Sequence, residues 1–216
     1  MPYSGSAWFY EVVGKALLAY FAKVNDDGGI NGRKVTVINL DDAVQPPKTV
    51  AQVRKMVAQE DVDAIVHQVG TATASPVRQY LNTKGVPQLF VMSGANTFQQ
   101  PKAYRYNTSA LMNCEFEAKM YGQMIVRETP DAKVGIPYQN DEDGKEDLRG
   151  MRSGFAKPLT AEVTDEQSDP TVDSQMLDLK AAGADMVLLA ADAKQVSQAL
   201  RKMSWPGWPG WPGWPG

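Results

Sequence analysis

Two hydroxyl-bearing segments follow short apolar runs that are typical of strands. Ala64-Ile65-Val66 precedes Gly70-Thr71-Ala72-Thr73, and the run at residues 88–91 precedes Met92-Ser93-Gly94-Ala95. Loops at the carboxyl ends of buried parallel strands are where α/β proteins bind ligands. Ser75-Pro76 predicts a helix start after the first loop, and a helix N-terminus favours an anion such as a carboxylate. A plain strand-to-helix connection, with its cap satisfied internally, fits the same residues.

Acidic side chains gather at the ends of two other predicted strands. Asp41-Asp42 follows the run at residues 35–40, and Asp141-Glu142-Asp143 follows the run at residues 133–138. Such carboxylates could bind Mg²⁺ or hold a phospho-acceptor, as in a receiver-like signalling module. Solvated turns account for them as well, because loops of this kind are usually exposed and polar. A signalling module, either a ligand sensor or a receiver, therefore stays open as an alternative function.

Residues that could support catalysis or metal binding lack partners in the sequence. His67 is the only histidine and Cys114 the only cysteine, so we predict no metal site and no cofactor, and we expect His67 to line a cleft or hinge. The chain has no Gly-x-Ser-x-Gly elbow, no His-Glu-x-x-His motif and no Gly-x-Gly-x-x-Gly after a strand. A hydrolase or amidase acting through Ser93 would lack a recognisable triad. We therefore predict that the protein is not an enzyme.

Composition limits the classes of partner. The chain has 216 residues and a net charge of −3 with both signs interspersed, so nothing indicates nucleic acid or an anionic membrane as a partner. A single cysteine excludes an internal disulfide. No apolar run approaches the ~20 residues that span a bilayer, and residues 1–5 lack the charged and apolar regions of a signal peptide. These features fit one large globular domain or two small ones.

Apolar periodicity predicts strands that alternate with helices. Strands are expected at about residues 35–40, 64–66, 88–91, 133–138, 161–164 and 186–190. Helices are expected at about residues 7–25, 46–59 and 115–128, after Ser75, and around residues 148–155, 172–179 and 196–203. In the helix at residues 115–128, Phe116, Met120 and Met124 share one apolar face. The alternation predicts an α/β protein with doubly wound parallel sheets.

The chain divides into three segments. The period is interrupted near residue 110, which predicts a partial lobe at residues 1–110 and a second partial lobe at residues 111–204. Trp-Pro-Gly then repeats four times over residues 205–216. Proline and glycine at every third position oppose both helix and sheet. We therefore expect this tail to be artificial or disordered.

The order of several motifs resembles the type I periplasmic solute-binding proteins of ABC importers, in the leucine/isoleucine/valine-binding branch. The likeness extends over residues 2 to 203, and it depends on the order and spacing of the motifs together. Those motifs are Asn25-Asp26-Asp27-Gly28-Gly29-Ile30-Asn31-Gly32-Arg33-Lys34, Leu40-Asp41-Asp42, Pro47-Lys48-Thr49-Val50-Ala51, Gly70-Thr71-Ala72-Thr73, Pro87-Gln88-Leu89-Phe90-Val91-Met92-Ser93-Gly94-Ala95, Tyr138-Gln139-Asn140-Asp141 with Gly144-Lys145, and Asp169-Pro170-Thr171-Val172-Asp173-Ser174-Gln175.

The resemblance implies two Rossmann-like lobes that close on a small ligand, a periplasmic location and delivery to a membrane permease. The ligand would be an amino acid, branched-chain or aromatic, or a similar small carboxylate. The resemblance implies ligand-binding roles that the residues alone do not reveal. Thr71, Thr73, Ser93 and the amide of Ala95 would hold the carboxylate, Trp8 or Tyr10 would form an aromatic wall, and Asp143 stands where the family usually has an aromatic residue.

Two departures from the family pattern affect this expectation. Family members begin with a strand before the loop in which this chain starts, and they continue beyond the helix at Leu200, where the Trp-Pro-Gly tract stands. We therefore expect two incomplete lobes, with the sheet of the first lacking a central strand. A folded fragment that no longer binds a ligand is the remaining alternative.

Overall fold

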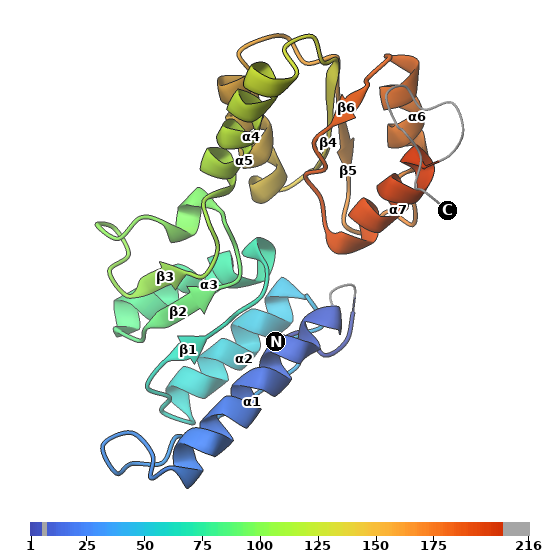
Figure 1. Cartoon of the computed structure of the whole chain (residues 1–216). Coiled ribbons are helices and arrows are strands. Elements are labelled where there is room, and N and C mark those ends of the chain that lie inside the picture. Colours follow the sequence, from blue (N-terminus) through green and yellow to red (C-terminus); the bar gives the residue numbers. More distant parts are fainter. Residues whose placement is uncertain (6–7, 205–216) are drawn as a thin grey trace. The chain divides into compact units, whose positions relative to one another are not determined.

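The computed structural model describes residues 1–5 and 8–204, and the chain forms two compact units, Met1–Leu111 and Met112–Gly216 (Figure 1). Each unit is described by itself. Residues 205–216, where the sequence predicts a tail, lie outside the described residues. Both units combine helices with a parallel sheet, so the predicted α/β class is confirmed.

The first unit has a three-stranded parallel sheet in the order β1-β2-β3. Apolar residues of α2 and α3 recur at helical spacing, and Val53, Val77 and Leu81 pack with Ile65 of β1 into a buried cluster. The elements are η1 Trp8–Tyr10, α1 Glu11–Asp26, α2 Pro46–Ala58, β1 Ile65–Val66, α3 Thr71–Lys84, β2 Gln88–Val91, η2 Asn96–Phe98 and β3 Asn107–Ser109.

Three buried amide side chains cross this sheet from strand to strand. Gln88 Nε2 donates to Gln68 Oε1 at 2.6 Å, and Asn107 Nδ2 donates to Gln88 Oε1 at 2.7 Å. Gln88 is 1% exposed and is the register partner of Asn107. Buried polar groups are costly unless hydrogen-bonded, so this ladder favours one register of the strands.

The second unit has helices on both faces of a parallel sheet in the order β5-β4-β6 (Figure 1). Val134 and Ile136 of β4 are fully buried with residues of α4 and α5. Residues of α6 and α7, including Met176 and Ala199, form a second buried cluster. The elements are α4 Cys114–Glu128, β4 Val134–Gln139, α5 Glu142–Phe155, β5 Ala161–Asp165, α6 Asp173–Ala181, β6 Met186–Val187 and α7 Ala193–Met203.

One predicted strand is not formed. Residues 35–40 belong to no strand among the described residues. A strand exists only through pairing with a neighbour, and here Val35 pairs with a side chain instead. Its N–H donates to Asn25 Oδ1 at 2.7 Å, and its carbonyl accepts from Asn25 Nδ2 at 2.8 Å. The β-branched composition of residues 35–40 favours a strand, but it could not supply a neighbouring strand to pair with.

The third helix begins earlier than predicted. It starts at Thr71 rather than at Ser75, and Pro76 lies inside it. Gly70 occupies the N-cap with φ 89°, a conformation that glycine adopts without strain. Thr71, Ala72 and Thr73 are therefore the first turn of α3 and not a loop.

The shared apolar face of α4 is exposed. Phe116, Met120 and Met124 are each more than 40% exposed, while Ala118, Gly122 and Ile125 are the buried residues of the helix. Small residues are buried here because α5 approaches α4 closely. A Cβ on Gly150 would lie 2.1 Å from the carbonyl oxygen of Glu115. Among the described residues, no helix is both long and apolar enough to cross a bilayer.

Candidate ligand-binding site

The carboxyl end of the first sheet brings two predicted hydroxyl segments together. Val69 pairs with Met92 in a parallel bridge, so the residues that follow each of them leave the sheet at the same edge. Thr71 Oγ1 lies 2.5 Å from Ser93 Oγ, and either hydroxyl could be the donor. The two residues are 6% and 2% exposed. The expected closeness of the two segments therefore has a direct physical basis in the parallel pairing of β1 and β2.

Ser93 also organises the loop that follows β2. The amide of Ala95 donates to Ser93 Oγ at 3.2 Å, and Ser109 Oγ donates to the Ser93 carbonyl at 2.5 Å. Ala95 is fully buried. Thr71, Ser93 and the Ala95 amide therefore form one connected hydrogen-bonded cluster.

Thr73 lies beside this cluster but turns back on its own helix. Its hydroxyl donates to the carbonyl of Val69, and the carbonyl of Gly70 lies 3.0 Å away. Thr73 is 1% exposed. This bond helps to close the first turn of α3, so a ligand could meet only the acceptor side of the hydroxyl without breaking it.

The start of α3 favours a negatively charged group. First-turn N–H groups have no partner within a helix, and the helix dipole adds a partial positive charge there. Gly70 has no side chain with which to cap these groups. Hydroxyl donors and an uncapped helix N-terminus together suit a carboxylate.

Arg78 is a further charged residue of α3 that the residue patterns did not single out. Its guanidinium lies 3.8 Å from the centre of the Tyr104 ring, and it donates to the carbonyl of Thr97 in η2. No ion pair joins it to an acid within residues 1–5 and 8–204. Its spacing of seven residues from Thr71, which places both on one helical face, could have indicated it.

The remaining predicted site residues lie on other elements. Trp8 and Tyr10 are in η1, where Trp8 is 59% exposed. Asp143 is in the first turn of α5 in the second unit, and its Oδ1 lies 4.0 Å from the sulfur of Cys114.

The acidic clusters have structural partners. Asp41 accepts from the Ser4 hydroxyl and from the amides of Tyr3 and Ala43, and these bonds hold its pKa well below the usual range. Asp42 is 5% exposed and accepts from the Thr49 hydroxyl at 2.8 Å.

Asp141 caps α5 by accepting from the Gly144 amide at 3.0 Å. No group of three or more acidic, histidine or cysteine side chains could hold a metal ion in the part of the chain that the structure describes. His67 instead packs its ring against Phe90, with 5.6 Å between the centroids.

A family model described as periplasmic binding protein matches residues 4–211. The chain belongs to the periplasmic binding protein family. This confirms the resemblance drawn from the order of motifs. The proteins it matches are substrate-binding proteins and not enzymes, in agreement with the missing catalytic pair.

Relatives and solved structures agree with this assignment. A Leu/Ile/Val-binding protein homolog 7 of Brucella abortus (strain 2308) is 27% identical over 199 residues, which cover 87% of this chain and 49% of the relative. A substrate-binding periplasmic protein from Ralstonia solanacearum has a TM-score of 0.80 at 26% identity, covering 93% of this chain and 57% of that one.

A solute-binding protein of an ABC transporter from Rhodopseudomonas palustris BisB5, in complex with 3,4-dihydroxybenzoic acid, has the same fold. Its TM-score is 0.81 at 18% identity, and the match covers 94% of this chain and 56% of that one. The chain spans about half the length of the proteins it matches. The type I periplasmic binding protein fold with parallel sheets is therefore confirmed, and the family is one of periplasmic proteins.

Proposed function

We propose that the chain binds a small solute through its carboxylate, at the start of α3. The observation that carries this proposal is the pairing of the Thr71 and Ser93 hydroxyls, 2.5 Å apart, beside an uncapped helix N-terminus. A carboxylate oxygen would replace one hydroxyl as the acceptor of the other. Hydrogen bonds to a charged group contribute about 1.5–3 kcal/mol each.

The solute class is an amino acid or an aromatic acid. The Brucella abortus relative is named as a Leu/Ile/Val-binding protein homolog, and the Rhodopseudomonas palustris protein is in complex with 3,4-dihydroxybenzoic acid. Both classes share the carboxylate that the hydroxyl cluster suits. The exposed ring of Trp8, with Tyr10, would line the apolar part of the solute, and Asp143 is a further proposed ligand-binding residue.

The proposed setting is that of the family. The solute would bind in the periplasm and pass to the membrane permease of an ABC importer. Support for this setting comes from the family match over residues 4–211 and from the likeness to the solute-binding protein of an ABC transporter from Rhodopseudomonas palustris BisB5.

Titration calorimetry of the whole chain would test the proposal. Leucine, isoleucine, valine and benzoate would be compared with the corresponding amides, which lack the negative charge. Thr71→Val removes the hydroxyl while keeping the shape, and we expect it to weaken binding by about 10- to 150-fold, as the loss of a charged hydrogen bond implies.

Thr83→Val is the matched control, because Thr83 lies near the C-terminal end of the same helix, is exposed, and bonds only with Gln79. Equal affinities for acids and amides, or an unchanged affinity of Thr71→Val, would contradict the proposal.

A further inference from the structure

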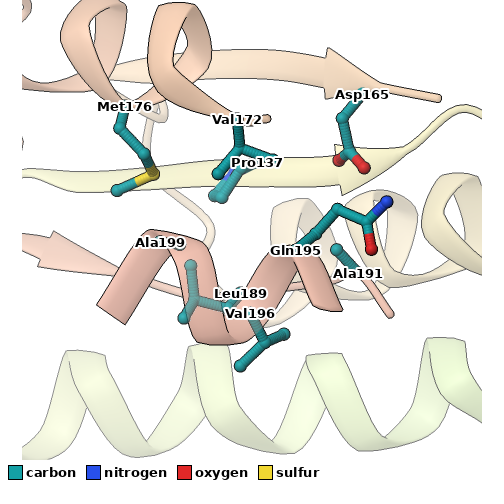
Figure 2. A pocket seen from close by; sticks show the side chains of 9 residues that line it. All are labelled: Pro137, Asp165, Val172, Met176, Leu189, Ala191, Gln195, Val196 and Ala199. Carbon is teal, nitrogen blue, oxygen red and sulfur yellow. The ribbon is translucent and has the colours of Figure 1, made fainter. Parts of the chain in front are cut away.

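Asp165, the last residue of β5, is an acid without a hydrogen-bond partner. It is 2% exposed, and both of its carboxylate oxygens are buried and unpartnered within the described residues. It lines a cavity of about 10 Å³ whose other walls are mainly apolar, including Val172, Met176 and Leu189. Figure 2 shows the carboxyl group at the same end of this cavity as the side chain of Gln195. The apolar walls offer no donor that could compensate a buried negative charge, and the amide of Gln195 donates to the carbonyl of Gln167 at 3.4 Å.

The other acids at this edge of the sheet are all partnered. Asp141, at the start of α5, accepts from the Gly144 amide at 3.0 Å. In the loop after β5, Glu166 accepts from Asn140 Nδ2 at 2.6 Å, and Asp169 accepts from the Glu166 amide at 2.9 Å. Two further charged groups lie at this edge. Asp192, at the start of α7, accepts from Gln167 Nε2 at 2.7 Å, and Lys194 donates to the Asp169 carbonyl.

Burial and the neighbouring negative charges all raise the pKa of Asp165. Burial, followed by the charges of Asp169, Asp192, Asp141 and Glu166, raises the pKa of Asp165 to about 6. Each of these four neighbours accepts a hydrogen bond, whereas Asp165 accepts none within the described residues. Protonation of Asp165 therefore removes a buried negative charge that has no hydrogen-bond donor among residues 1–5 and 8–204 and is repelled by its neighbours.

A hydrogen-bond acceptor for the protonated carboxyl group of Asp165 lies on the neighbouring strand. Gln139 of β4 is the register partner of Asp165 in the parallel ladder, and residues paired in this way project from the same face of the sheet. Its Nε2 donates to Asp141 Oδ2 at 2.5 Å, which orients the amide and leaves Oε1 as the other polar atom. That oxygen is buried and has no partner in the described part of the chain.

We propose that Asp165 is a proton-operated latch: when protonated, it donates a hydrogen bond to Oε1 of Gln139 and ties the carboxyl ends of β5 and β4 together. The proton comes from solvent and returns to it, so no other reactant is needed. One bond then satisfies two buried groups that are orphaned when the carboxyl group is charged. On ionisation, repulsion from the four neighbouring acids loosens the loops that leave this edge.

The latch gives this edge a pH dependence of definite sign. The folded-state pKa is raised above the ordinary value of 3.8, so the folded unit binds the proton more tightly than the unfolded chain. Its contribution to stability is fully present below about pH 4 and is lost as the pH rises toward 6 and beyond. Ligands of doubly wound sheets bind at the carboxyl ends of strands. In a mildly acidic medium, the hydrogen bond from protonated Asp165 would hold the carboxyl ends of β5 and β4 together at this edge.

Carbon-13 NMR of the aspartate carboxyl groups in the whole chain would test the latch, with the Asp165 resonance assigned by its loss in Asp165→Asn. We expect Asp165 to titrate near pH 6. Gln139→Met removes the acceptor but keeps the length of the side chain, and it should lower the apparent pKa of Asp165. Asp178→Asn, which removes an exposed charge on α6, is the control and should leave that titration unchanged.

Thermal melts from pH 5 to pH 8 provide a second readout. Asn at position 165 is a permanent neutral donor, so Asp165→Asn should match the wild type at pH 5 and melt higher at pH 8. A titration of Asp165 near its ordinary value would overturn the proposal. It would also be overturned if Na⁺ or Ca²⁺ at pH 8 stabilised the wild type but not Asp165→Asn, because a cation would then occupy the place of the proton.

Discussion

Helices α4 and α5 approach each other so closely that two glycines of α5 touch the backbone of α4. A Cβ on Gly154 would lie 2.0 Å from the carbonyl oxygen of Lys119, and a Cβ on Gly150 would lie 2.1 Å from that of Glu115. Backbone atoms cannot rotate away as a side chain can. Gly154→Ala must therefore push the two helices apart, by roughly 1.5 Å if the new contact is to reach an ordinary separation of about 3.5 Å.

The expected loss of stability follows from two opposing effects. Overpacking a close contact costs about 1–3 kcal/mol, and a backbone overlap belongs at the upper end of that range. Alanine is better than glycine inside a helix by about 0.8–1 kcal/mol. The net loss for Gly154→Ala is therefore about 2 kcal/mol. In a unit of roughly 100 residues, 2 kcal/mol lowers the melting temperature by about 8–16 °C.

Thermal and urea melts followed by circular dichroism would measure this loss. Ser153→Ala is the matched control, because Ser153 is exposed on the same turn of α5 and the change alters only helix propensity. Gly150→Ala combined with Gly154→Ala should cost less than the sum of the two, since one separation of the helices relieves both overlaps. A Gly154→Ala variant as stable as the wild type, or more stable, would refute the close packing of these helices.

Three further predictions concern other parts of the chain. Gln88→Met should lower the stability of the first unit by about 2 kcal/mol or more in urea melts, because Gln68 and Asn107 each lose their partner; an unchanged midpoint would contradict the amide ladder. Burial and nearby carboxylates raise the pKa of the Cys114 thiol, so iodoacetamide at pH 8 should alkylate the native chain far more slowly than the unfolded chain, and equal rates would count against this. The hydrogen bond that Ser4 donates to Asp41 depresses the pKa of that carboxyl group. The stability advantage of the wild type over Asp41→Asn should therefore be present above pH 4 and shrink as the pH falls to 2. A constant difference between the two in melts at several pH values would disprove this.

Much of the architecture could be predicted because it depends on local pattern. Continuous apolar runs predicted five of the strands, β4 among them, and helical spacing predicted helices at residues 46–59 and 115–128, where α2 and α4 lie. The closeness of Thr71 and Ser93 is explained by the parallel pairing of β1 and β2, since the ends of parallel strands meet at one edge. The strands and helices themselves needed only the sequence and the period of each element.

The places where the prediction differs from the structure depend on what lies next to a segment. Residues 35–40 have a strand-like composition but no ladder, because pairing requires a second backbone. The start of α3 moved to Thr71 because Gly70 turns the chain there, despite the helix-start signal at Ser75-Pro76. The exposed face of Phe116 and the unpartnered oxygens of Asp165 were equally absent from any local pattern.

The sequence by itself therefore determined the family and the α/β class, and it showed hydroxyl-bearing residues after two of the predicted strands. Only the tertiary structure decided that glycines bury one face of α4 against α5, that Arg78 lies over the ring of Tyr104, and that Asp165 is paired in register with Gln139 of β4. The physical reason is that periodicity and chain reversal are properties of neighbours in sequence. Burial, pairing and the partner of a charge are set by atoms that are distant along the chain and close in space.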